Sequence, residues 1–174
     1  MSEPFHLSTN LGRLGQAGDE IGFSASAEER AALARLAEVL EVPSFAARIG
    51  LKKLSPNRFL VSCALTADVV QACVVSLEPV PAHIEKQFRR ELHYTPNLRR
   101  PVEGEVTLSP EEEEGPEEIG SLHYDLAGPL VEEFLLALDP YPRAPGVAFT
   151  PPEDADAKPE SPFAVLKSLK SGKK

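Results

Sequence analysis

The chain has 174 residues, enough for one domain of about 130 to 150 residues with flexible ends but too few for two full domains. Its formal net charge of −9 argues against non-specific attraction to nucleic acid or anionic membranes, so any RNA contact must come from a local basic patch. With 42% hydrophobic residues and no Trp the core must be aliphatic, and the 17 prolines predict frequent turns.

We expect neither an export signal nor a membrane span, because no basic opening segment precedes an apolar stretch and no apolar run reaches membrane-spanning length. Cys63 and Cys73 are too few for a secreted disulfide scaffold, and both lie in apolar, strand-like sequence. These features predict a cytoplasmic protein with reduced thiols.

The first clear element is a helix that follows an extended lead-in over residues 1–23, where an edge strand would also fit. Ser26 stands three residues before Glu29, the capping-box spacing in which each side chain satisfies the other residue's backbone N–H. Apolar residues then recur at helical spacing, namely Ala32, Leu33, Leu36, Val39 and Leu40. The pattern predicts a helix from about residue 27 to residue 41, ended by Pro43.

Strands are expected after this helix, because the hydrophobic period shifts towards two between residues 45 and 92. The turn-forming sequences SPN at 55–57 and EPVP at 78–81 separate three runs. The middle run is too long for one strand, so we expect it to turn near Ala67–Asp68.

The last run, residues 82–92, fits either a helix or a strand. Ile84, Phe88 and Leu92 recur at helical spacing, but sequential strands tend to pair with their neighbours, which favours a strand. We therefore expect about four antiparallel strands in this region, forming a sheet that the first helix can cover.

An acidic loop and a second helix follow. Residues 103–118 hold eight glutamates and no basic residue, which predicts a solvated loop. In DLAGPLVEEFLLALDPYPR, Pro129 suits a first helical turn and Asp139–Pro140 an end, so we expect a helix from about 129 to 138. Its apolar face comprises Leu130, Val131, Phe134, Leu135 and Leu138.

Together these elements predict a single α+β domain over residues 1–149. The polar, proline-rich residues 150–160 are typical of a linker, and residues 161–174 form a C-terminal motif peptide. The sheet is expected to be antiparallel, or a partly open barrel-like meander, of about four to six strands with two main helices, the acidic loop and a flexible C-terminal tail.

No familiar catalytic or cofactor motif is present, since the chain lacks G-x-S-x-G, a P-loop, G-x-G-x-x-G and H-E-x-x-H. His6, His83, His93 and His123 are isolated in sequence, so each is expected at the surface or between strands rather than in catalysis. Cys63 and Cys73 are spaced too widely for a zinc knuckle and are expected to be buried as small apolar side chains.

Acidic residues also give no clear site. Glu132 and Glu133 are interpreted as helix surface rather than as a paired acid and base. We therefore predict no catalytic residue, no cofactor and no metal site. One alternative stays open, a metal-dependent hydrolase or nuclease that uses the carboxylates of Glu111–Glu114.

Basic residues gather in two places. Between residues 86 and 100, a single acid, Glu91, accompanies five bases: Lys86, Arg89, Arg90, Arg99 and Arg100. Between residues 161 and 174 there is no acid beside Lys167, Lys170, Lys173 and Lys174. Each place could hold a polyanion, and scattered solubilising charge is the alternative.

The order of three segments points to a family. These are CVVSLEPV at 73–80, DLAGPLVEEFLLALDPYPR at 125–143 and SPFAVLKSLK at 161–170. Over roughly residues 70–174 the sequence resembles the YceD family, the large ribosomal RNA subunit accumulation proteins of bacteria and plastids. Where many members have a second cysteine this chain has Ser76, so a role built on a C-x-x-C pair cannot operate here.

The resemblance implies a non-enzymatic role in the accumulation of large-subunit ribosomal RNA and in ribosome assembly. We hypothesise that the protein binds a pre-ribosomal particle, rRNA or a ribosomal protein, and no membrane. The candidate partner-binding residues are Phe163, Leu166, Lys167, Lys170, Arg89, Arg90, Arg99 and Arg100. A protein-binding module unrelated to RNA is the alternative.

The C-terminal peptide has the pattern of a short helix. Ser161 can cap it, and Phe163 and Leu166 fall on one side. So short a helix needs a partner to be stable in water. That partner is either the protein's own domain or a larger particle.

Overall fold

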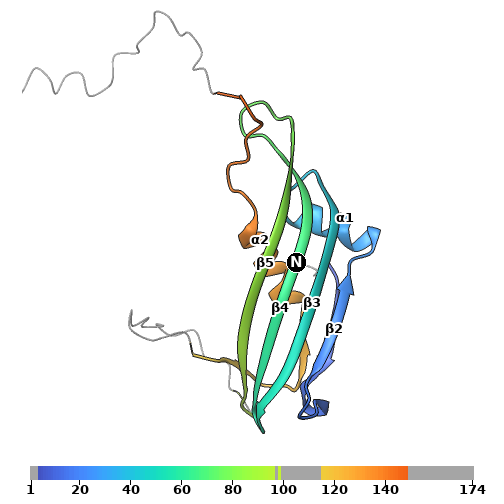
Figure 1. The fold of residues 1–174 in the computed structure, drawn as a ribbon, viewed down its shortest axis with the longest axis vertical. Helices are drawn as coiled ribbons and strands as arrows, with labels where there is room; N and C mark the ends of the chain where they lie inside the picture. The colour runs from blue at the N-terminus through green and yellow to red at the C-terminus, as the bar shows by residue number, and fades with distance from the viewer. Residues whose placement is uncertain (1–3, 97, 99–114, 149–174) are drawn as a thin grey trace, which may run out of the picture.

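The structure is a computed structural model that describes residues 4–96, 98 and 115–148. Figure 1 shows a curved sheet with two helices behind it. In chain order the elements are β1 Ser8–Asn10, the 3₁₀ helix η1 Leu11–Arg13, β2 Asp19–Ser24, α1 Ala27–Leu36, β3 Glu41–Ser55, β4 Arg58–Ala72, β5 Pro79–Tyr94, β6 Glu117–Ile119, β7 His123–Asp125 and α2 Ala127–Ala137.

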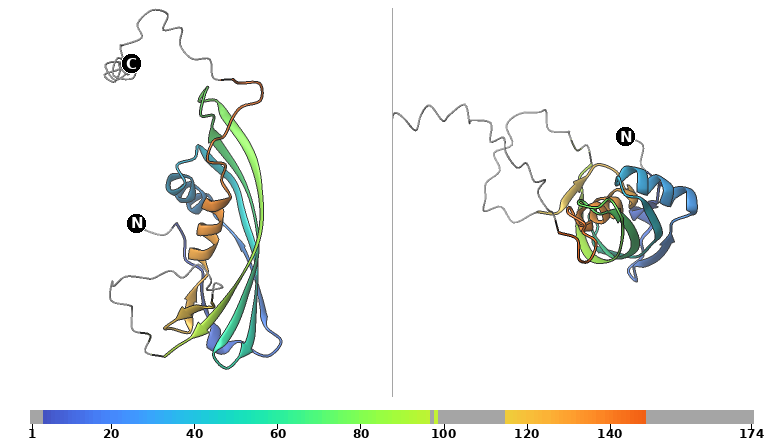
Figure 2. Two further views of the ribbon diagram at one scale, coloured as in Figure 1. Left: turned by 90° about the vertical axis from the view of Figure 1, so that its left-hand side faces the viewer. Right: turned by 90° about the horizontal axis from the view of Figure 1, so that it is seen from above.

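The main sheet has five strands in the order β2-β3-β4-β5-β6. Strands β2 to β5 pair antiparallel in sequence order, and β6 adds to β5 in parallel. A second, two-stranded sheet joins β1 to β7. Both helices lie on the concave side of the main sheet, which leaves its outer face uncovered by any described element (Figure 2). The predicted α+β fold with an open, barrel-like meander is confirmed.

The core lies between the concave face of the sheet and the helices. Strands β3 and β4 alternate buried and more exposed residues, as strands do when one face is covered. Phe45 from β3 stands edge-to-face with Phe134 from α2, with ring centroids 5.5 Å apart. Phe5 from the N-terminal lead-in also packs on Phe45, so the lead-in belongs to the same core.

Helix α1 begins as predicted but ends earlier. Ser26 and Glu29 form the capping box, with each side chain accepting the other residue's backbone N–H. The prediction that the helix extends to residue 41 is wrong, because the helix ends at Leu36 and Glu38 adopts a left-handed φ of 53°. Pro43 lies inside β3, between Glu41 and Ser44, where the register is irregular, and such irregularities are where strands tolerate proline.

The strand predictions are confirmed in part. Residues 82–92 lie in β5, so the strand interpretation is correct there, and the chain reverses after Ser55 as the SPN sequence predicts. The predicted turn at Ala67–Asp68 is wrong. Ala67 is fully buried on the concave face, and Asp68 on the outer face is bonded to the neighbouring strands, so β4 continues to Ala72.

The acidic segment and the second helix also differ from prediction. Residues 103–114 lie outside the described residues, but Glu117 and Glu118 belong to β6 rather than to a loop. Helix α2 begins at Ala127, two residues before Pro129, and Leu135 is exposed rather than part of the buried face. The linker at 150–160 and the peptide at 161–174 lie outside the described residues.

Asp125 fixes the start of α2 against the N-terminal lead-in. Its carboxylate accepts hydrogen bonds from the backbone N–H groups of Ala127 and Leu7 and contacts the His6 ring. Burial raises the pKa of Asp125, but these hydrogen bonds outweigh it and hold that pKa below its ordinary value. Asp125 therefore supplies the N-terminal cap that Leu126 cannot.

Candidate functional site

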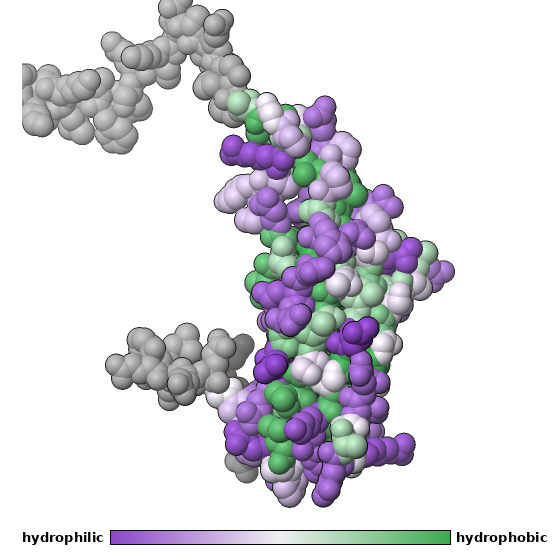
Figure 3. Space-filling view, viewed as in Figure 1, coloured by the Kyte–Doolittle hydropathy of each residue, from purple (hydrophilic) through white to green (hydrophobic). Residues whose placement is uncertain are grey.

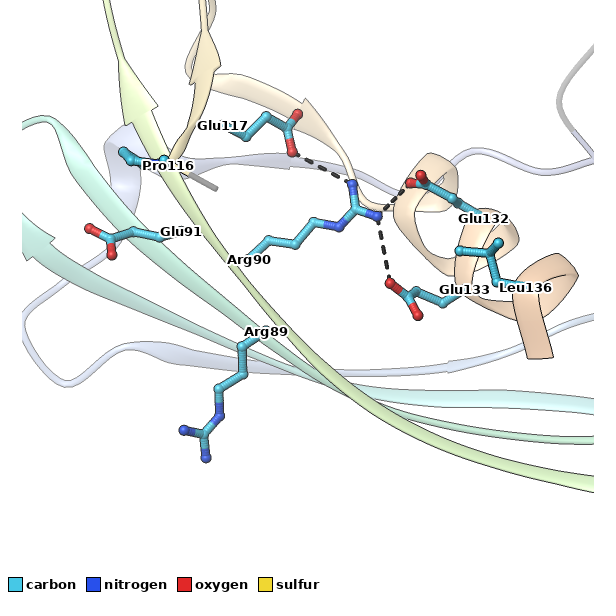
Figure 4. Close-up of a pocket in the computed structure, with 9 residues that line it drawn as sticks. Arg89, Arg90, Glu91, Pro116, Glu117, Glu132, Glu133 and Leu136 are labelled. Atoms are coloured by element: carbon cyan, nitrogen blue, oxygen red, sulfur yellow. Dashed lines mark hydrogen bonds and ion pairs between the residues drawn. The ribbon is translucent and has the colours of Figure 1, made fainter. Parts of the chain in front are cut away.

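Arg90 is the centre of a charged cluster on the concave side of the sheet. Its guanidinium points toward α2 and β6 (Figure 4) and contacts the carboxylates of Glu117, Glu132 and Glu133. The Arg90 side chain is 25% exposed and that of Glu133 only 17%. We call Arg90, Glu117, Glu132 and Glu133 the Arg90 cluster. It ties the parallel edge strand and the second helix to the long strand β5.

Electrostatics keep the Arg90 guanidinium charged. Burial lowers its pKa, but the adjacent Glu132 carboxylate outweighs this and raises the pKa of Arg90 above its ordinary value. Lys86 lies four residues before Arg90 on the same face of β5, and its Nζ is 3.7 Å from a carboxylate oxygen of Glu133. Glu132 lies on the helix surface as predicted, with its side chain 55% exposed, whereas Glu133 is only 17% exposed; the carboxylates of both contact bases of the sheet.

A hollow of about 710 Å³ opens beside the Arg90 cluster. Its walls come from β5, from the approach to β6 and from α2, and they include the exposed side chain of Leu136. Each carboxylate of the cluster contacts the single guanidinium of Arg90, so acidic groups outnumber basic ones in the Arg90 cluster.

Arg89 lies on the opposite face of β5. Neighbouring residues of a strand point to opposite faces, and Figure 4 shows Arg89 directed away from α2. It has no ion pair among the described residues. The basic run predicted from the sequence is thus divided between two faces, with Arg90 neutralised and Arg89 at the outer face.

The outer face is shallow and built from small residues. Gly50, Ser62 and Ala64 floor a hollow of about 650 Å³ that Arg48 and Arg89 border. Figure 3 views this face and shows pale, weakly hydrophobic residues among strongly hydrophilic ones. Arg48 is 3.4 Å from Glu20, and both side chains are exposed, so this ion pair is weak.

The other predicted partner-binding residues lie outside the described residues. These are Arg99, Arg100, Phe163, Leu166, Lys167 and Lys170. The structure places only Arg89 and Arg90 of the predicted set.

A third arrangement centres on Cys73, where β4 ends. Its Sγ accepts hydrogen bonds from the backbone N–H groups of Val75 at 3.5 Å, Ser76 at 3.4 Å and Ala144 at 3.3 Å. Val74 N–H donates to the Pro142 carbonyl at 2.9 Å, which joins the same two segments again. Figure 1 shows the chain after α2 running beside the β4–β5 turn to this end of the sheet. We call this end, formed by residues 73–78 and 139–144, the apical end.

The pKa values of the two cysteines are shifted in opposite directions. The Ser76 hydroxyl, with the backbone N–H groups of Ser76, Ala144 and Val75, lowers the pKa of Cys73 from 9.0 to about 6. Burial, assisted by the charge of Glu133, raises the pKa of Cys63 to about 11. Both thiols are buried and free, as predicted, but Cys73 is a hydrogen-bond acceptor rather than an apolar filler.

Exposed hydrophobic side chains surround Cys73. Val74, Leu77 and Tyr141 are 47%, 76% and 71% exposed, and we call these three the apical surface. Leu77 has a left-handed φ of 62°, a conformation that costs a residue with a side chain about 1 kcal/mol or more. Its N–H donates to the Cys73 carbonyl, which closes the turn in this conformation.

Ser44, Asp68 and His83 form a polar row on the outer face. The Ser44 hydroxyl and the His83 ring both bond to the Asp68 carboxylate, each at 2.6 Å. The carboxylate raises the pKa of His83 and thereby favours the imidazolium. Because the hydroxyl donates to the carboxylate and not to the ring, this row does not present an activated serine.

Within residues 4–96, 98 and 115–148, no group of three or more His, Cys, Asp or Glu side chains is arranged to hold a metal ion. No helix in that part of the chain combines the length and apolarity that crossing a membrane requires.

Comparison with known families decides the relationship. A family model described as large ribosomal RNA subunit accumulation protein YceD matches residues 61–170. The chain belongs to the YceD family. Searches of curated proteins and of solved structures gave no match.

The YceD match begins within β4 and continues past α2 to residue 170, and it includes both segments of the apical end. CVVSLEPV and the end of DLAGPLVEEFLLALDPYPR are far apart in sequence, yet Cys73, Val74 and Pro142 bring them into hydrogen-bonding contact. Ser76 occupies the position of a second thiol beside Cys73, and its Oγ lies 3.1 Å from a carboxylate oxygen of Glu78.

Sequence reasoning missed the apical surface. The burial of Cys73 was expected, but its bond to Ala144 joins residues 71 positions apart, and no periodic pattern reports such a contact. The available signal was that CVVSLEPV and DLAGPLVEEFLLALDPYPR both resemble the YceD family, but this resemblance does not report that the two segments are in contact.

Proposed function

We propose that this protein is a non-catalytic factor that supports the accumulation of large-subunit ribosomal RNA, and so assembly of the large subunit, in the cytoplasm. The observation that carries the proposal is the YceD family match over residues 61–170, well over half of the chain. The proposed mode of action is binding to a ribosomal protein or to a pre-ribosomal particle.

The geometry is compatible with binding at two places. The outer face of the sheet is uncovered and carries Arg89 without an ion pair among the described residues. The apical end exposes hydrophobic side chains on a hydrogen-bonded frame. The groups with chemical potential for catalysis have other partners: Cys73 is fully buried, and Ser44 donates to Asp68.

Depletion of the protein tests the proposal. Large-subunit rRNA should fall relative to small-subunit rRNA, measured by quantitative hybridisation, and large-subunit particles should decrease in sucrose gradients. A plasmid copy of the wild-type gene should restore both. Normal large-subunit rRNA and normal particles after depletion would contradict the proposed function.

The C-terminal peptide is part of this proposal on sequence grounds alone. A chain ending at Glu160 and a Phe163→Ala, Leu166→Ala variant are expected to lose the same ribosomal partner in a pull-down. If both variants retain that partner, the peptide is not the contact.

A further inference from the structure

The apical surface combines exposure with rigidity. Val74, Leu77 and Tyr141 expose much of their apolar area, although they belong to two segments that are hydrogen-bonded to each other. Gln71 donates from its side chain to the Asp139 carbonyl at 2.9 Å, and Ala144 donates to Cys73 Sγ. A pre-ordered apolar surface loses little conformational entropy when a partner covers it.

Leu77 is the least expected residue at this place. A left-handed backbone favours glycine or asparagine, and water favours a polar side chain, yet the turn presents a leucine that is 76% exposed. Both preferences are overridden at the same residue. Such local exceptions cluster at binding sites, because selection for a partner keeps what stability alone would not.

The surroundings of the apical surface are acidic. Three segments form or adjoin this surface: 38–44, 68–83 and 138–148. Glu41 pairs with Val70 and Val70 pairs with Pro81, so neighbouring strands bring the first segment beside the second. The Asp68 carboxylate is matched by His83. The remaining charged residues of these segments are Glu38, Glu41, Glu78, Asp139 and Arg143. Four acids against one base repel phosphates and attract cationic groups.

We propose that the apical surface docks a basic protein segment through at least one apolar side chain, with cationic residues beside it. The apolar contact covers Val74, Leu77 and Tyr141, and the cations meet the acidic surroundings. RNA and anionic lipid do not fit this surface, because both would bring negative charge to it. The choice of partner rests on the proposed function: because that function concerns the large ribosomal subunit, we expect the basic segment to belong to one of its proteins.

The test measures binding of the full chain to individually purified proteins of the large ribosomal subunit. Leu77→Asn removes the apolar side chain and keeps a residue that tolerates the left-handed backbone. Leu136→Asn is the matched control, since Leu136 is 71% exposed and lies on α2. Melting curves of each variant check that the fold is kept.

At least one basic protein should bind the wild type, and Leu77→Asn should weaken that binding about tenfold or more, as loss of a central apolar contact does. Tyr141→Ser should have an effect of similar size, and Leu136→Asn should bind like the wild type. Glu78→Gln should weaken binding and reduce its dependence on salt.

The inference is overturned if no large-subunit protein binds, if rRNA binds in place of protein, or if Leu77→Asn and Tyr141→Ser both bind like the wild type. These failures are separate from failure of the proposed function. Suppose that depletion lowers large-subunit rRNA and that the Leu77→Asn and Tyr141→Ser variants both restore it fully. The proposed function would then stand, and the apical docking site would be refuted.

Discussion

Replacing Arg90 by methionine tests whether the Arg90 cluster stabilises the fold. Methionine retains most of the apolar stem but removes the charge that faces Glu117, Glu132 and Glu133. Glu133 is largely buried and would keep only Lys86 at 3.7 Å. Hydrogen bonds to charged groups contribute about 1.5–3 kcal/mol, and the exposure of Glu132 favours the lower part of that range.

The expected loss in the free energy of unfolding is therefore about 2 kcal/mol, which lowers the melting temperature by about 4–8 °C. Urea and thermal unfolding followed by circular dichroism measure both quantities. Arg89→Met is the control, because Arg89 lies on the outer face and should change stability by no more than about 0.5 kcal/mol.

A double-mutant cycle identifies the cause. Arg90→Met combined with Glu132→Gln should reveal a coupling energy of about 1 kcal/mol if the two groups interact as the geometry indicates. If Arg90→Met destabilises no more than Arg89→Met, or if the coupling is zero, the cluster does not hold α2 and β6 to the sheet.

Three further changes test other parts of the structure by urea unfolding. The folded pKa of Cys73 is about 6, below its ordinary value of 9.0, so the free energy of unfolding should rise from pH 6 to pH 9. Cys73→Ala should flatten this rise. If wild type and Cys73→Ala show the same dependence of stability on pH, the lowered pKa of Cys73 is contradicted. Gly18→Ala should lower the free energy of unfolding by about 2 kcal/mol or more, because φ is 78° and the new Cβ would lie 2.5 Å from the carbonyl oxygen of Leu51. Gly22→Ala is the control and should be nearly neutral, because its Cβ would meet no atom within 4 Å. Phe134→Ala should cost about 3–5 kcal/mol through a core cavity, against less than about 0.5 kcal/mol for Leu136→Ala; similar losses would mean that Phe134 is not part of the core.

Local patterns predicted the elements whose causes are local. The capping box of Ser26 and Glu29 set the start of α1, and alternation of apolar residues identified the long strands. The end of α1 escaped prediction, because Val39 and Leu40 keep a helical spacing while the chain already turns at Glu38. The continuity of β4 also escaped prediction, since the bonds that hold Asp68 come from Ser44 and His83 on other strands.

The candidate sites were predictable only where one segment contains them. Arg89 and Arg90 are adjacent in sequence, but the two-residue period of a strand places them on opposite faces. Each has a different environment, because α2 covers one face and not the other. Leu77 could be identified as exposed only after its turn was known, since CVVSLEPV alone reads as an apolar strand segment.

The attachment of Ala144 to Cys73 also determines where the rest of the chain starts. Twelve residues lie between Ala148 and Ser161, and covalent geometry lets this stretch span at most about 45 Å in any conformation. Chain length therefore limits the separation between Ala148 and Ser161, the first residue of the peptide, to that span. A partner that contacted both the peptide and the apical surface would be held by two linked contacts, the second forming at a local concentration set by the tether. Loss of either contact would then reduce the avidity of the whole, so each could be weak alone and still be required.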